Sequence, residues 1–275
     1  MMRLSTCRGA DRTLNKDGFI GVFDSGLGGL SVLHEIRQLL PGEDLVYLAD
    51  SAHVPYGGHD EGFIRDRSLA IGGFLAAAGA RMVVVACNTA TAAAVPTLRE
   101  HLALPVVGME PAVKPAAAAT RSGIVGVLAT VGTLRSARFA ALLDRFGSGI
   151  GVLTEPCPGM VEAVEHGALE TPETRELVAR HVQPLIQGGA DVIILGCTHY
   201  TFLRQQIETA AGPSVTVIDT SRAVARQVAA RLGKSAGHRD VGAQRFMTTG
   251  SAERLQPALE MLWPGAGTLE TVHDL

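Results

Sequence analysis

Two apolar runs of this chain, 110 residues apart, each end in a cysteine followed by small hydrogen-bonding side chains. The two segments are Met82-Val83-Val84-Val85-Ala86-Cys87-Asn88-Thr89 and Val192-Ile193-Ile194-Leu195-Gly196-Cys197-Thr198-His199. Continuous Val/Ile/Leu runs are typical of buried parallel strands, and ligands of open α/β sheets bind at the carboxyl ends of such strands. Two thiols in matching positions indicate an acid and a base on opposite faces of one substrate.

Strands and helices alternate along the rest of the chain, which predicts βαβ units and a mostly parallel sheet. Expected strands cover 19–23, 45–48, 82–86, 106–107, 123–129, 150–153, 191–195, 215–218 and 245–248. Expected helices cover 30–40, 63–78, 89–102 with a break near Pro96, 137–146, 160–165, 174–187, 223–232 and 252–262. The fold class is therefore α/β.

The order of elements repeats once. From Asp24 to Cys87, and again from Thr130 to Cys197, a small polar loop, helix, strand and helix lead to a strand that ends in cysteine. This repeat predicts two pseudo-symmetric, doubly wound domains with the active site in the cleft between them. We expect one domain over 18–112 plus 221–275, the other over 113–220, and a disordered tail or over-extended start over 1–17.

Composition excludes several classes of protein. A chain with 47% hydrophobic and 19% charged residues can build a sizeable core. A net charge of −3 and only 4% aromatic residues argue against direct nucleic-acid binding. No apolar stretch is long enough for a membrane span, no signal peptide is visible, and the four cysteines form no CxxC, so a cytoplasmic protein with reduced thiols is expected.

The thiols leave alternatives open. A buried cysteine is often only a small hydrophobic residue, although two in matching settings make that interpretation weaker. Zinc is a poor fit because no second ligand cluster accompanies Cys197 and His199. The three lysines, Lys16, Lys114 and Lys234, lie outside strand-end motifs, so no pyridoxal-phosphate lysine is apparent.

The loop Asp24-Ser25-Gly26-Leu27-Gly28-Gly29 lies between a predicted strand and a predicted helix. It lacks the GxGxxG and GxSxG patterns, so neither a dinucleotide site nor a hydrolase nucleophile is expected. Its backbone N–H groups can bind a carboxylate, or the glycines can simply form a tight turn. Asp24 is either a helix cap or a functional carboxylate.

Several of these segments together resemble the bacterial glutamate racemase family. They are Ile20-Gly21-Val22-Phe23-Asp24-Ser25-Gly26-Leu27-Gly28-Gly29-Leu30, Pro55-Tyr56-Gly57, Ala86-Cys87-Asn88-Thr89-Ala90-Thr91-Ala92 and Leu195-Gly196-Cys197-Thr198-His199-Tyr200. The resemblance runs from about Phe19 to Gly250. Glu162 and His53 depart from the usual family residues, and the tail up to Asp17 has no counterpart.

The resemblance implies cofactor-independent interconversion of L- and D-glutamate by two cysteines, supplying D-glutamate for peptidoglycan. It implies catalytic roles for Cys87, Cys197, Asp24, His199 and Glu165. It implies substrate contacts by Asp24, Ser25, Tyr56, Gly57, Asn88, Thr89, Thr130, Thr198 and His199. It further implies a homodimer without metal, membrane or nucleic-acid partners. An aspartate or hydantoin racemase, or a protein that acts chiefly as a binding or regulatory partner, remains the alternative.

Overall fold

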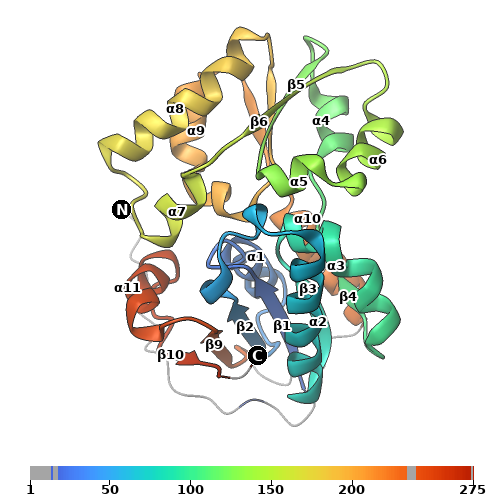
Figure 1. Ribbon diagram of the computed structural model, residues 1–275, viewed down its shortest axis with the longest axis vertical. Helices are drawn as coiled ribbons and strands as arrows, with labels where there is room; N and C mark the ends of the chain where they lie inside the picture. Colours follow the sequence, from blue (N-terminus) through green and yellow to red (C-terminus); the bar gives the residue numbers. More distant parts are fainter. Residues whose placement is uncertain (1–13, 15–17, 234–239, 274) are drawn as a thin grey trace.

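The structure is a computed structural model that describes residues 14, 18–233, 240–273 and 275. Its secondary structure forms two lobes stacked along the long axis of the molecule (Figure 1). Each lobe is built around one sheet, and every strand pairing among the described residues is parallel. The predicted tail over 1–17 lies outside the described residues, apart from Leu14.

The first lobe contains a six-stranded sheet in the order β10-β9-β2-β1-β3-β4. Its strands are β1 (Phe19–Asp24), β2 (Leu45–Ala49), β3 (Ala80–Val85), β4 (Val106–Val107), β9 (Gln244–Thr248) and β10 (Leu269–Thr271). Its helices are α1 (Leu30–Leu39), α2 (Glu61–Ala77), α3 (Asn88–His101), α10 (Ser221–Leu232) and α11 (Ala252–Leu262). Two short 3₁₀ helices, η1 (Ser51–His53) and η2 (Tyr56–Gly58), follow β2.

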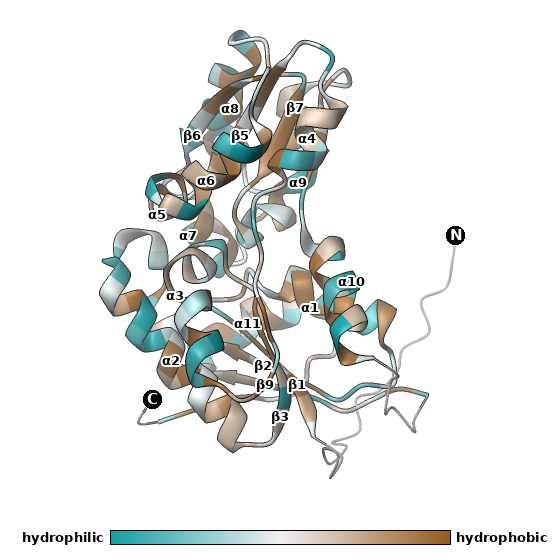
Figure 2. Ribbon diagram, turned by 90° about the vertical axis from the view of Figure 1, so that its right-hand side faces the viewer, coloured by the Kyte–Doolittle hydropathy of each residue, from teal (hydrophilic) through white to brown (hydrophobic). Residues whose placement is uncertain are grey.

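Both faces of this sheet are covered, which explains why its central strands are apolar throughout. In β1, Ile20 and Val22 pack with α1, α10 and α11, whereas Phe19 and Phe23 pack with α2 and α3 on the opposite face. The apolar strands run through the middle of both lobes in Figure 2.

The second lobe contains a four-stranded sheet in the order β6-β5-β7-β8. Its strands are β5 (Ile124–Ala129), β6 (Gly151–Pro156), β7 (Val192–Leu195) and β8 (Thr216–Ile218). Its helices are α4 (Val113–Ala119), α5 (Val131–Arg135), α6 (Ala137–Phe146), α7 (Met160–Glu165), α8 (Pro172–Gln187), α9 (Arg204–Ala211) and the 3₁₀ helix η3 (Thr198–Leu203). The helices α7, α8 and α9 cover one face, and α4 and α6 cover the other.

The two sheets share a topology. The order β2-β1-β3-β4 in the first lobe corresponds to β6-β5-β7-β8 in the second. In the first lobe β1 pairs with β2 and β3, and in the second lobe β5 pairs with β6 and β7. The prediction of two pseudo-symmetric, doubly wound units with mostly parallel sheets is therefore confirmed. The chain passes between the lobes twice, after β4 and after β8.

One predicted feature was wrong and several elements were missed. The helix α3 is not broken at Pro96 but continues to His101. A proline removes only one helical hydrogen bond, and Ala94, Val95 and Leu98 around it remain buried in the core beneath the helix. The sequence prediction did not include α4, α5, α9, β10 or the 3₁₀ helices.

None of the helices over the described residues combines the length and apolar character of a membrane crossing.

Candidate active site

The carboxyl ends of four strands, two from each lobe, meet where the lobes face each other. Asp24 ends β1 and Cys87 follows β3 in the first lobe, while Thr130 follows β5 and Cys197 follows β7 in the second. Each pair occupies corresponding positions in its sheet, because β1 and β5, and β3 and β7, are topological equivalents. Strand ends of this kind are where α/β sheets bind ligands.

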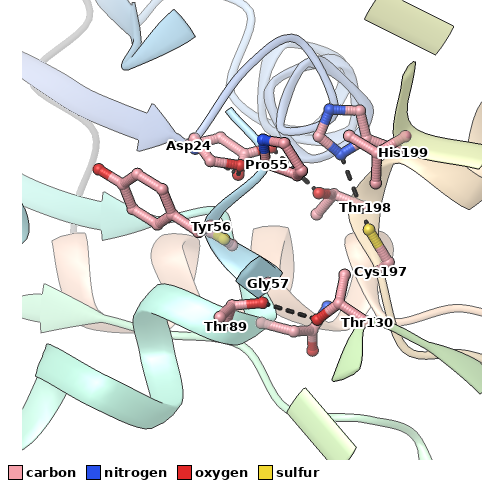
Figure 3. A pocket seen from close by; sticks show the side chains of 13 residues that line it. Asp24, Pro55, Tyr56, Gly57, Thr89, Thr130, Cys197, Thr198 and His199 are labelled. Atoms are coloured by element: carbon pink, nitrogen blue, oxygen red, sulfur yellow. Dashed lines mark hydrogen bonds between the residues drawn. The ribbon is translucent and has the colours of Figure 1, made fainter. Parts of the chain in front are cut away.

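These strand ends enclose a small cavity (Figure 3). It is lined by Asp24, Ser25, Pro55, Tyr56, Gly57, Cys87, Asn88, Thr89, Thr130, Val161, Cys197, Thr198 and His199. Its volume of about 10 Å³ is room for roughly one water molecule. The cavity thus has room for little more than a water molecule, and both candidate catalytic thiols line it.

Cys87 lies at the N-terminus of α3 and is 5% exposed. Its Sγ accepts a hydrogen bond from the backbone N–H of Ala90 at 3.5 Å. Burial, followed by the nearby charge of Asp24, raises the pKa of the Cys87 thiol well above its ordinary value. Cys87 is therefore held as a neutral thiol in this closed arrangement.

Cys197 has an imidazole as its neighbour instead. Its Sγ lies 3.7 Å from His199 Nδ1 (Figure 3), and the opposite ring nitrogen, Nε2, lies 2.6 Å from Glu165 Oε1. Because a carboxylate can only accept, Nε2–H donates to Glu165. Burial lowers the pKa of His199, but its contacts with Cys197 and Glu165 outweigh this and hold that pKa well above the ordinary value. A protonated His199 can donate to the Cys197 sulfur.

Asp24 lines the cavity and connects the two lobes. It is fully buried, its Oδ1 accepts from the Ser25 N–H at 2.6 Å, and its Oδ2 accepts from the Thr198 hydroxyl at 3.0 Å. Burial raises the pKa of Asp24 above its ordinary value, although the charge of His199 opposes the shift. Its side chain does not cap a helix: α1 begins after Gly29 and has no side-chain cap.

The side chain of Asn88 is buried against the cavity with unused hydrogen-bonding capacity. Its Oδ1 and Nδ2 have no hydrogen-bond partner among the described residues, although the residue is only 4% exposed. Buried amides are normally satisfied, so an unpaired one that lines a cavity is a candidate ligand contact.

Three threonine hydroxyls join the lobes on the other side of the cavity. Thr89 Oγ1, from α3, lies 3.0 Å from Thr130 Oγ1 of the second lobe (Figure 3). It also lies 3.2 Å from Thr133 Oγ1 of the same lobe. Thr130 also caps α5 by accepting from the Thr133 N–H. These contacts span the two lobes and would separate if the cleft widened at this point.

In the loop after β2, Gly57 packs against the second lobe, while the phenol of Tyr56 is held by another residue of the first lobe. The Tyr56 ring points away from Cys197 (Figure 3), and its hydroxyl donates to Asp50 Oδ2 at 2.6 Å. A Cβ on Gly57 would lie 2.7 Å from Thr130 Cβ, so glycine lets this loop pack directly against the second lobe. The Tyr56 hydroxyl is already engaged.

The structure brings together nearly all of the residues singled out from the sequence. Eleven of the twelve predicted site residues line the cavity, and Glu165 lies behind His199 instead. Sequence reasoning assigned no site role to Val161 or Pro55, which line the cavity, or to Thr133, which contacts Thr89. The sequence offers only their neighbours as a signal: Val161 lies in the predicted helix 160–165, Pro55 precedes Tyr56, and Thr133 lies three residues after Thr130. Within the described ranges, no group of three or more His, Cys, Asp or Glu side chains is arranged to hold a metal ion.

The chain is similar to known proteins over most of its length. The sequence profile of the Asp/Glu/Hydantoin racemase family matches residues 20–228. The chain is 57% identical to a glutamate racemase of Ectopseudomonas mendocina over 246 residues, covering 88% of this chain and 94% of the relative.

Two solved structures resemble the whole fold. A glutamate racemase from Bacillus anthracis matches with a TM-score of 0.84 and 32% identity, covering 95% of this chain and 99% of that one. The Escherichia coli glutamate racemase, solved with L-glutamate and the activator UDP-MurNAc-Ala, matches with a TM-score of 0.84 and 34% identity, covering 94% and 99%. The chain therefore belongs to the Asp/Glu/Hydantoin racemase family.

Proposed function

We propose that this protein is a glutamate racemase that interconverts L- and D-glutamate, with Cys87 and Cys197 as the two acid/base groups. The observation that carries this proposal is that two thiols from topologically equivalent strand ends line one cavity between the lobes. Inversion of an α-carbon needs a base on one face and an acid on the other, and this arrangement provides both without turning the substrate over.

The two thiols have different neighbours, which supports different resting roles. Cys87 sits beside the carboxylate of Asp24 as a neutral thiol and is suited to deliver a proton. Cys197 sits beside His199, whose positive charge stabilises the negative charge on a thiolate that accepts one. In the proposed L-to-D direction, Cys197 removes the α-proton and Cys87 donates to the opposite face; the reverse reaction exchanges these roles.

The intermediate carbanion needs electrostatic stabilisation, because the α-proton of an amino acid is only weakly acidic. The amide of Asn88 lines the cavity and can donate to the α-carboxylate as charge develops on it. The hydroxyls of Ser25 and Thr198 also line the cavity, but they donate to Asp24 here and would have to turn from Asp24 to donate to the substrate. The unpaired Asn88 amide supports this role most directly. Thr89, Thr130 and the main chain of Gly57 offer further contacts from both lobes.

Substrate entry requires the lobes to separate. Glutamate is far larger than the roughly 10 Å³ enclosed here. We propose that residues 18–112 with 221–275 and residues 113–220 move as two bodies about the two chain crossings. The Thr89–Thr130 contact would break on opening and be replaced by contacts to substrate.

The relatives named glutamate racemase also support a biological role. We propose that the product, D-glutamate, supplies peptidoglycan synthesis and that the enzyme works as a homodimer. The family description also covers aspartate and hydantoin racemases, so these are the competing substrates within the same chemistry.

The proposal is tested by incubating purified protein with L-glutamate or D-glutamate and following circular dichroism. Both signals should decay to zero, since enantiomers are equally stable. Parallel incubations with L-aspartate and with a chiral hydantoin identify the alternatives. Racemisation of either of these, with unchanged glutamate, would overturn the assignment of substrate.

A further inference from the structure

The glycine-rich loop of the first lobe contacts a carboxylate, but that carboxylate belongs to the protein. The backbone N–H of Leu27 donates to Glu165 Oε1 at 2.6 Å, across 138 residues of sequence and from one lobe to the other. The same oxygen accepts from His199 Nε2–H, while Glu165 Oε2 has no hydrogen-bond partner among the described residues. The position of this carboxylate is therefore set by Leu27 and His199 together.

Two glycines of the loop make room for this contact. A Cβ on Gly26 would lie 2.7 Å from Glu165 Cδ and overlap Oε1, and a Cβ on Gly28 would lie 2.6 Å from His199 Cε1. Neither glycine has a φ in the left-handed region. Alanine would thus be acceptable to the backbone at both positions, and what excludes it is a side chain of the opposite lobe in each case.

A buried tyrosine holds the peptide unit that binds Glu165. The Tyr47 hydroxyl, from β2, donates to the Gly26 carbonyl at 2.6 Å. That carbonyl and the Leu27 N–H belong to the same planar peptide. The hydrogen bond from Tyr47 therefore also fixes the direction in which the Leu27 N–H points. A continuous chain of hydrogen bonds runs from Tyr47 through this peptide to Glu165, His199 and then Cys197.

We propose that the Asp24–Gly29 loop is a socket that seats Glu165 when the lobes close, so that Gly26, Leu27 and Tyr47 are positioning residues for the His199–Cys197 pair. None of them needs to touch the substrate. Closure of the cleft and the orientation of His199 then become a single event, because the N–H that holds Glu165 comes from the other lobe. This inference rests on the proposed two-thiol reaction.

The test is a double-mutant cycle between Gly26 and Glu165. In G26A the new methyl group should push the flexible carboxylate away from Leu27 and His199, and kcat should fall about tenfold or more, as expected for a misplaced catalytic group. E165A should show a similar loss, and G26A/E165A should be no worse than E165A, because the three heavy atoms nearest to the new methyl group all belong to the carboxylate that E165A removes. Y47F should give a smaller loss that also vanishes in the E165A background.

A matched control is G73A, since Gly73 lies in α2 and a Cβ there meets nothing within 4 Å. It should retain the kcat of the parent protein. Normal kcat in G26A, or losses that multiply in the double variant, would overturn the proposal.

A second measurement does not depend on turnover. The proton between His199 Nε2 and Glu165 should give a downfield ring N–H resonance by NMR, identified by its loss in H199N. It should be lost or shifted equally in G26A and E165A and kept in G73A. If the parent protein fails to racemise glutamate, the proposed function fails, but this resonance still decides the role of the socket: an unchanged signal in G26A would refute it.

Discussion

At the scale of single residues, the two thiols differ in the charge that each one faces. Cys87 has Asp24 nearby, and Cys197 has the His199–Glu165 pair. The fold supplies equivalent strand ends, and the side chains that follow them make the two ends chemically unequal. This inequality supports the proposed roles of Cys87 as the acid and Cys197 as the base in the L-to-D direction.

Asp24 should lower the stability of the folded protein at neutral pH. Its folded-state pKa lies above the ordinary value of 3.8, so between these two values the folded protein binds a proton more tightly than the unfolded chain does. The stability contributed by this group therefore falls as the pH rises through that window. D24N should be at least as stable as the parent protein at neutral pH, with an advantage that shrinks as the pH approaches 3.8, while racemisation is lost.

Urea denaturation of both proteins at a series of pH values measures this difference. S148A changes a side chain in the distant turn between α6 and β6 and serves as the control for handling and baseline. A stability difference that does not depend on pH, or one that grows toward acid, would contradict the expected burial of a charged Asp24.

The sequence predicted which residues line the site better than it predicted the contacts that hold them in place. Cys87, Cys197 and Thr198 follow apolar strands and were visible as a pattern. The contact of Glu165 with Leu27 spans 138 residues, and no local pattern encodes it. The sequence of the first loop predicts a tight turn or backbone N–H groups that bind a carboxylate, whereas Gly26 and Gly28 leave space for the side chains of Glu165 and His199.

At the scale of helices and strands, apolar periodicity located most of the architecture. The elements that it missed are short or polar: α4 is an alanine-rich segment of seven residues, and α9 begins Arg-Gln-Gln. Among the described residues, the three-residue strand β10 pairs with β9 alone, at the edge of its sheet. Tertiary contacts rather than local sequence stabilise such segments.

Adjacent glycines in α2 provide an element-scale test. A Cβ on Gly72 would lie 2.7 Å from Leu98 Cδ2 on α3, whereas one on Gly73 meets nothing within 4 Å. G73A should raise the free energy of unfolding by about 0.5–1 kcal/mol through helix propensity. G72A should lower it by roughly 1 kcal/mol or more through overpacking. Denaturant melts of the two variants check this, and equal shifts would show that α2 and α3 pack differently.

At the scale of the whole molecule, binding should depend on both lobes. The cavity walls come from Asn88 and Thr89 on one side and Thr198 and His199 on the other. A ligand that bridges them stabilises the native state by RT ln(1 + [L]/Kd), about 2.7 kcal/mol at 100 Kd. L- or D-glutamate should therefore raise the melting temperature, and aspartate, one methylene shorter, should raise it less at equal concentration.

Thermal melts with and without each amino acid provide the measurement. D-Lysine, which lacks the second carboxylate, serves as a control for nonspecific effects of solutes. Stabilisation by aspartate equal to or above that by glutamate would favour an aspartate racemase.

The central claim is that one thiol removes the α-proton of the substrate and the other donates a proton to the opposite face. The most direct test measures racemisation and α-proton exchange by C87S and C197S in D₂O. Each inversion uses both thiols, so each variant should lose racemisation, followed by circular dichroism. Each should also retain at most exchange of the α-proton of one enantiomer, followed by NMR, and the two variants should prefer opposite enantiomers. C157S, which changes a third buried cysteine outside the cavity lining, should racemise normally. Near-normal racemisation by either C87S or C197S would contradict the two-thiol mechanism.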